Sequence, residues 1–124
     1  MRIMIVEDEA ILALALIRYL ESKGHLVVGH FYAAEEAVRM LDDKNPEIVL
    51  MDLSLQGEMT GLEAGLVVIN KKIPLVVVSA HTDQETLEEI KKIGCRFHLV
   101  KPINYTQLEK TMAEAVKSVA SGGK

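Results

Sequence analysis

The chain has 124 residues, of which 49% are apolar and 26% charged, and its formal net charge is −4. This length suits one ordinary domain, and the high apolar fraction with modest net charge excludes a disordered chain. The longest uninterrupted apolar run, Ala10–Ile17, is far shorter than the roughly 18 residues that a membrane span needs. With a single cysteine, Cys95, and no basic patch, the composition predicts a cytoplasmic domain that lacks disulfides and does not itself bind membranes or nucleic acid.

Short apolar runs alternate with segments of helical spacing from one end of the chain to the other. The runs show no polar alternation, which is typical of strands in a parallel sheet that is covered on both faces. Five such strands are predicted, over Ile3–Val6, Leu26–Val28, Ile48–Met51, Leu75–Val78 and Leu99–Val100.

Apolar residues at intervals of three and four follow each of these runs and predict amphipathic helices. Five helices are expected, over Leu12–Leu20, Ala34–Leu41, Leu62–Ile69, Leu87–Ile93 and Leu108–Val119. Gly24 is positioned to end the first helix, and Asn104 with Gln107 resembles a capping box at the start of the last. The strict alternation predicts a doubly wound α/β domain, (βα)₅, with right-handed crossovers.

Ligands of an open parallel sheet bind at the carboxyl ends of its strands, so the residues that follow each apolar run are the candidates for function. Four of the five runs are followed by acidic, hydroxyl or ammonium side chains, namely Glu7 and Asp8, Asp52, Ser79 and Lys101. The second run is followed by Gly29 and His30, with no recognisable chemistry. His25 and His30 show no metal-ligand spacing and are interpreted as structural or exposed.

Carboxylates gathered at one edge repel one another unless a cation compensates them. A set of oxygen ligands suits Mg²⁺, and a carboxylate can also accept a phosphoryl group. An ammonium such as that of Lys101 would offset the added charge, and the Ser79 hydroxyl could donate to a phosphoryl oxygen.

Each of these residues also has a simpler explanation when taken alone. Glu7, Asp8 and Glu9 could complement the dipole of the helix that follows them, and Asp52 could be an ordinary turn residue. Ser79 alone is uninformative, and Lys101 alone could be a solvated surface charge. Their joint occurrence at the correct strand ends favours a functional site.

Four segments carry a family resemblance, and they are Ile5–Glu9, Val49–Leu53, Val78–Ala80 and Leu99–Pro102. In this order the chain resembles a response-regulator receiver domain of bacterial two-component signalling, from about Arg2 to Val119. The resemblance implies a flavodoxin-like three-layer sandwich whose five-stranded parallel sheet has the order 2-1-3-4-5. The receiver domain would span residues 1–120, with 121–124 as a flexible tail.

By that resemblance, Asp52 is the phosphoacceptor and the cofactor is Mg²⁺. Asp8 would bind the metal directly and Glu7 mainly through metal-bound water, together with Asp52 and the backbone carbonyl of Ser54. Ser79 would contact the phosphoryl group and reposition on activation. Lys101 would form a salt bridge to it, and the Lys101–Pro102 peptide is expected to be cis.

The resemblance implies a phosphorylation-activated switch that receives its phosphoryl group from a histidine kinase or a histidine phosphotransfer protein. Its chemistry would be limited to its own phosphorylation and slow autodephosphorylation. Phosphorylation would change the face formed by the helix over Leu87–Ile93, the last strand and the last helix. The output would pass to an effector domain or protein, and the chain would be a monomer or weak homodimer.

Three other functions compete with this one. A Mg²⁺-dependent phosphohydrolase would usually carry an acid two residues after its nucleophile, where this chain has Ser54. A flavin- or nucleotide-binding module would need a phosphate-cradling loop where Glu7, Asp8 and Glu9 stand. A degenerate, non-phosphorylated receiver is the nearest rival, and the intact acidic set weighs against it.

The chain departs from the family pattern at three positions. His98 stands where many members have an aromatic switch residue, so we expect switching to depend on pH between about 6 and 8. The segment after Asp52 is one residue longer than the commonest form, with Gln56 in place of proline. His81 lies two residues after Ser79, where a side chain can influence dephosphorylation.

Overall fold

The computed structural model describes residues 1–55, 57–80 and 83–120, so Gln56, His81 and the predicted tail at 121–124 lie outside the described residues. Its strands form one parallel sheet in the order β2-β1-β3-β4-β5. The strands are β1 (Arg2–Val6), β2 (Leu26–Phe31), β3 (Ile48–Asp52), β4 (Leu75–Ser79) and β5 (His98–Val100). The predicted doubly wound fold and its strand order are confirmed.

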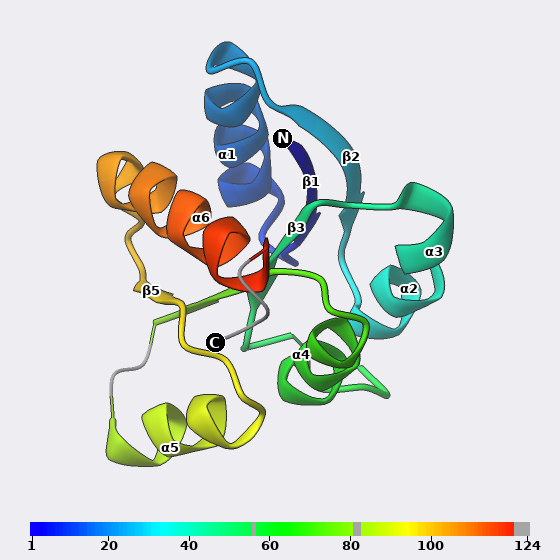
Figure 1. The fold of residues 1–124 in the computed structure, drawn as a ribbon, viewed down its shortest axis with the longest axis vertical. Helices are drawn as coiled ribbons and strands as arrows, with labels where there is room; N and C mark the ends of the chain where they lie inside the picture. The colour runs from blue at the N-terminus through cyan, green and yellow to red at the C-terminus, as the bar shows by residue number, and fades with distance from the viewer. Residues whose placement is uncertain (56, 81–82, 121–124) are drawn as a thin grey trace.

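Helices cover both faces of the sheet, and Figure 1 shows α1 and α6 on one side and α2 to α5 on the other. The helices are α1 (Ala10–Ser22), α2 (Ala34–Arg39), α3 (Leu41–Lys44), α4 (Gly61–Asn70), α5 (Gln84–Lys92) and α6 (Tyr105–Ala120). No helix within the described ranges is long and apolar enough to cross a membrane.

Two hydrophobic cores, one on each face, explain why the strands are apolar along their whole length. Ile3 and Ile5 of β1 point to the core under α1 and α6. Met4 and Val6 point to the core under α2 to α5. Since successive side chains of a strand point to opposite faces, both sets must be apolar when both faces are covered.

The structure corrects two of the predicted elements. The helix expected over Ala34–Leu41 is two short helices, because the Met40 N–H bonds to the Ala37 carbonyl three residues back and tightens the turn between α2 and α3. Strand β2 extends to Phe31 instead of ending at Val28, since Gly29 and His30 continue to pair with β1.

Polar caps fix the starts of the two helices that flank the functional edge. The Asn104 side chain accepts a hydrogen bond from the Gln107 N–H at 2.9 Å, as predicted for the start of α6. At the start of α4, Thr60 and Glu63 form a reciprocal capping box that the sequence analysis missed, although its Thr-x-x-Glu spacing is a recognised signal. Gly61 follows this cap, and a Cβ there would lie 2.8 Å from the Asp52 carbonyl oxygen. A glycine is therefore needed for α4 to begin this close to the end of β3.

Candidate functional site

A three-residue acidic turn joins β1 to α1 at the carboxyl edge of the sheet. Glu7 continues β1 into the interior and is 4% exposed, whereas Asp8 and Glu9 are exposed. The Glu9 N–H donates to the Glu7 carboxylate at 3.0 Å, so the turn folds back on its own buried acid. This arrangement places one buried and two exposed carboxylates within a single turn.

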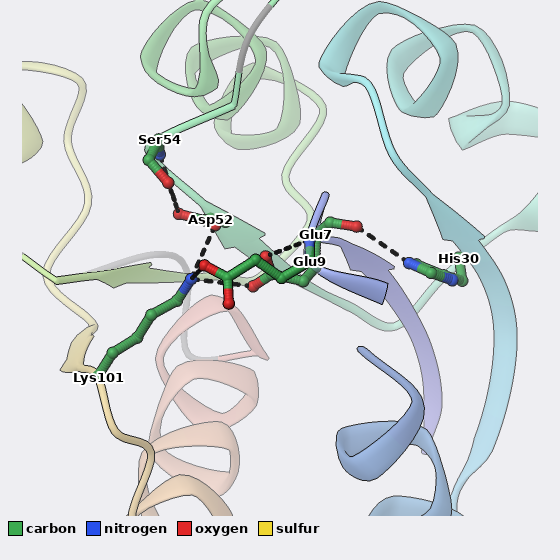
Figure 2. A network of polar contacts seen from close by, with 6 residues as sticks. All are labelled: Glu7, Glu9, His30, Asp52, Ser54 and Lys101. Carbon is green, nitrogen blue, oxygen red and sulfur yellow. Dashed lines mark hydrogen bonds and ion pairs between the residues drawn. The ribbon is translucent and has the colours of Figure 1, made fainter. Parts of the chain in front are cut away.

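Asp52 is the last residue of β3, and its carboxylate is held at both oxygens. Ser54 donates to Oδ1 through both its backbone N–H and its hydroxyl, each at 2.9 Å. The Lys101 ammonium donates to Oδ2, also at 2.9 Å. Figure 2 shows these contacts converging on Asp52 from two sides. The side chain is only 2% exposed, so its orientation is set by these partners and not by solvent.

Lys101 follows β5, and its ammonium lies among three carboxylates. Besides the contact with Asp52, Nζ lies 3.3 Å from Glu7 Oε1 and 3.6 Å from Glu9 Oε1. The Lys101–Pro102 peptide is cis, as predicted. The ammonium therefore bridges the acid that ends β3 and the acidic turn that follows β1 (Figure 2).

Ser79 ends β4 between the strands that carry Asp52 and Lys101. Its carbonyl accepts a hydrogen bond from the Lys101 N–H at 3.0 Å, and its side chain is buried. His98 lies elsewhere, because it begins β5 and pairs with Val77, below the carboxyl edge. The structure thus gathers Glu7, Asp8, Asp52, Ser54, Ser79 and Lys101 at one edge and leaves His98 apart from them.

The two buried acids of the cluster, Glu7 and Asp52, have pKa values that are shifted in opposite directions. The pKa of the Glu7 carboxyl is raised to about 7, mainly by burial. The hydrogen bond from the Glu9 N–H favours ionisation and lowers this pKa, whereas the neighbouring Asp52 raises it. Burial also opposes ionisation of Asp52, but hydrogen bonds from Ser54 and Lys101 outweigh it and lower the pKa of Asp52 below its usual value. Burial likewise disfavours the charged form of Lys101, yet the facing carboxylates raise the pKa of its ammonium. At neutral pH the pair is an ionised Asp52 beside a charged Lys101, with Glu7 near its midpoint.

The donor set fits a hard divalent cation. Glu7, Asp8 and Asp52 each offer one carboxylate oxygen, and these oxygens all lie within 4.8 Å of one another. Oxygen ligands of this kind are those that Mg²⁺ and Ca²⁺ prefer. Burial, and to a smaller extent the neighbouring Asp52, raise the pKa of Glu7, and a bound cation would favour the ionised form of this carboxyl.

Comparison with known proteins identifies the family. Residues 3–113 match the family model of the response regulator receiver domain. The chain belongs to this family. Among curated relatives it is 30% identical to the transcriptional regulatory protein PdtaR of Mycobacterium tuberculosis over 93% of this chain. It is 28% identical to the chemotaxis protein CheY of Thermotoga maritima over 94% of this chain and 98% of CheY.

Solved structures of receiver domains have the same fold as this chain. The signal receiver domain of a modulated diguanylate cyclase from Desulfovibrio desulfuricans G20 superimposes with a TM-score of 0.90 at 30% identity, covering 97% of this chain and 96% of that one. A CheY-like receiver domain from Methanospirillum hungatei has a TM-score of 0.85 at 21% identity, covering 98% of each chain. The present chain spans only 56% of the length of PdtaR.

Glu9 and His30 also contact the site, although neither was predicted as a site residue. Glu9 lies 3.6 Å from Lys101, and its place in an acidic triplet after β1 was the available signal. His30 contacts the Glu7 carbonyl at 3.1 Å, and no signal in the sequence marked it. The interpretation of His30 as merely structural or exposed therefore misses a contact with the site.

We predict that Glu7 makes the metal-free receiver domain less stable as pH rises. Between its ordinary value of 4.5 and its folded pKa of about 7, the folded state holds a proton that the unfolded chain has released. The free energy of unfolding therefore falls through this window, by about 3 kcal/mol at most. Glu7→Gln should flatten the decline, which urea denaturation in EDTA at pH 5 to 8 would measure. An unchanged slope in the variant would contradict the prediction.

His98 should act in the opposite direction and at lower pH. Burial lowers the pKa of its ring below the usual 6.5, and its Nε2 is buried with no hydrogen-bond partner within the described part of the chain. Titration of His98, which the sequence led us to expect between about pH 6 and 8, is therefore expected at more acidic pH. Below about pH 6.5 the unfolded chain binds a proton that the folded state excludes, so the free energy of unfolding falls as pH falls. His98→Phe should remove this acid sensitivity in the same denaturation series, and a variant that is equally acid-sensitive would refute it.

Proposed function

We propose that the chain is a phosphorylation-controlled switch whose phosphoacceptor is Asp52. The observation that carries this proposal is an ionised carboxylate at the end of β3, 2.9 Å from the Lys101 ammonium and within one acidic cluster with Glu7 and Asp8. An aspartate oxygen attacks the phosphorus of a phosphohistidine, and the new P–O bond forms as the P–N bond breaks. The imidazole leaves with the electron pair and takes up a proton. Water later hydrolyses the aspartyl phosphate, which releases inorganic phosphate and restores the carboxylate.

Each neighbouring side chain has a part in this proposal. Lys101 holds the carboxylate in place and balances the charge that the phosphoryl group adds. Ser54 fixes the orientation of Asp52 through two hydrogen bonds to Oδ1, and Ser79 donates its hydroxyl to a phosphoryl oxygen. Glu7, Asp8, Asp52 and the Ser54 carbonyl would hold Mg²⁺, which when bound neutralises charge between the carboxylate and phosphoryl oxygens.

The switch is proposed to act through the face made by α5, β5 and α6. A groove of about 410 Å³ lies on this face between α5 and the start of β5, lined by Leu87, Lys91, Arg96 and His98 among others. Leu87 is 36% exposed and Val100 of β5 is 41% exposed, which leaves apolar surface for a partner. We propose that the chain is cytoplasmic and that a histidine kinase or phosphotransfer protein is its phosphoryl donor. The recipient would be an effector domain or protein, and the receiver itself a monomer or weak homodimer.

The test is phosphorylation of the purified chain by acetyl phosphate with Mg²⁺, followed by intact-mass spectrometry. We expect uptake of one phosphoryl group that hydroxylamine removes, because it is an acyl phosphate, and no uptake in EDTA. A chain that takes up none would be a degenerate receiver. Sustained turnover of a phosphomonoester such as p-nitrophenyl phosphate would instead favour a phosphohydrolase.

A further inference from the structure

The His30 ring lies against the backbone of the acidic turn, and Figure 2 shows it on the side of Glu7 away from Lys101. Its Nε2 is 3.1 Å from the Glu7 carbonyl oxygen. A carbonyl oxygen can only accept, so this nitrogen carries the hydrogen and donates it. Tyr32 flanks the ring with a centroid separation of 4.6 Å and a tilt of 55°, which restricts its orientation. The histidine is thus a directed donor to the main chain of the turn.

An irregularity in the sheet turns His30 toward this position. Ile3 pairs with Val27, but Met4 pairs with Gly29, so β2 advances by an extra residue at Val28. With the shift, His30 pairs with Ile5, whose side chain points to the core under α1 and α6. Without it, His30 would pair with Val6 and face the opposite layer. Bulges next to functional sites commonly re-aim a side chain in this way.

Lys101 holds the Glu7 and Glu9 carboxylates of the turn from outside, but it does not contact the main chain of the turn. The Glu7 N–H donates to the Phe31 carbonyl at 3.0 Å, and the Glu9 N–H donates to the Glu7 carboxylate within the turn. Glu9 is the N-cap of α1 but makes no side-chain capping bond. Among the side chains that the structure describes, His30 therefore supplies a tether between the neighbouring strand and the main chain that carries Glu7 and Asp8.

We propose that His30 is a positioning residue that preorganises the acidic turn for a divalent cation. Its hydrogen bond fixes the Glu7 carbonyl and so limits the conformations from which the Glu7 and Asp8 carboxylates project. Ligands that are already in place lose less freedom on binding, and outer contacts of this kind typically change metal affinity by about 10- to 100-fold. The inference rests on the proposed metal site and adds a residue to it that binds no metal itself.

The test measures binding of Mn²⁺ alone, from the loss of the free-ion EPR signal, in four proteins. His30→Phe keeps an aromatic ring but cannot donate, and we expect its dissociation constant to rise about tenfold. His30→Gln can donate from its amide and should recover most of the affinity. His25→Phe is the matched control, because His25 lies at the other end of β2 and contacts Glu109 of α6. Its affinity should equal that of the wild type.

Circular dichroism and urea denaturation show which variants are folded. Wild-type affinity in a folded His30→Phe overturns the inference, as does a folded His30→Gln that binds as weakly as His30→Phe. If His30→Phe does not fold, His30→Met serves as the second variant without a donor, and the same two results decide. A wild-type chain that binds no Mn²⁺ would overturn the metal site itself, which distinguishes that failure from a failure of His30 alone.

Discussion

An Asp52→Asn variant is expected to take up no phosphoryl group from acetyl phosphate and Mg²⁺ under conditions in which the wild type takes up one. The amide is a far weaker nucleophile than the ionised carboxylate, whose charge the Ser54 and Lys101 hydrogen bonds preserve at neutral pH. The asparagine oxygen can still accept from Ser54, so the fold should survive the change. Intact-mass spectrometry after a fixed incubation measures the loss.

Asp43→Asn provides the matched control for this experiment. Asp43 is an exposed aspartate in the first turn of α3, on the far side of the sheet from α1 and α6. The same change of acid to amide there should leave phosphoryl uptake at the wild-type level. Undiminished uptake by Asp52→Asn would mean that another side chain is the acceptor and would contradict the assignment.

Lys101→Met is expected to cost the largest amount of stability of the substitutions considered. Its ammonium is 14% exposed and faces the carboxylates of Asp52 and Glu7, which are 1% and 5% exposed. Removing one partner of such a buried group leaves uncompensated charge, which typically costs about 3 kcal/mol. The raised pKa of Lys101 means that its contribution is fully present below its ordinary value of 10.5 and is lost only as pH rises through the folded value. The full effect should therefore appear at pH 7.5.

Urea denaturation in EDTA measures this loss, and Lys71→Met is its control. Lys71 pairs with Asp42 at 3.1 Å on the surface, with side chains 39% and 88% exposed. Breaking that pair should change the free energy of unfolding by less than about 1 kcal/mol. Adding Mg²⁺ should restore part of the stability of Lys101→Met, because the cation replaces the missing positive charge. Equal stabilities of the two variants without metal would show that the cluster needs no ammonium.

The individual elements show which features can be predicted from the sequence and which cannot. The strands were found because their apolar runs are short and end abruptly at charged or hydroxyl residues. The helical break at Met40 was missed because the apolar spacing continues through it, and only the hydrogen bond to Ala37 reveals the tighter turn. The extension of β2 was missed because Gly29 and His30 are neither apolar nor β-branched, and pairing with β1 holds them in the strand.

The sequence by itself determined the order of the elements and which side chains stand at the functional edge. Those properties follow from local polarity and from a rule of topology, since parallel strands present their carboxyl ends together. Only the tertiary structure decided the contacts between side chains from different strands. The 2.9 Å bond from Lys101 to Asp52, the burial that raises the pKa of Glu7, and the irregularity at Val28 that turns His30 toward the turn all depend on how distant segments pack. The composition shows only that the chain is acidic. Packing brings some of its acids into one cluster and fixes the distances and solvent exposure that set the chemistry of that cluster.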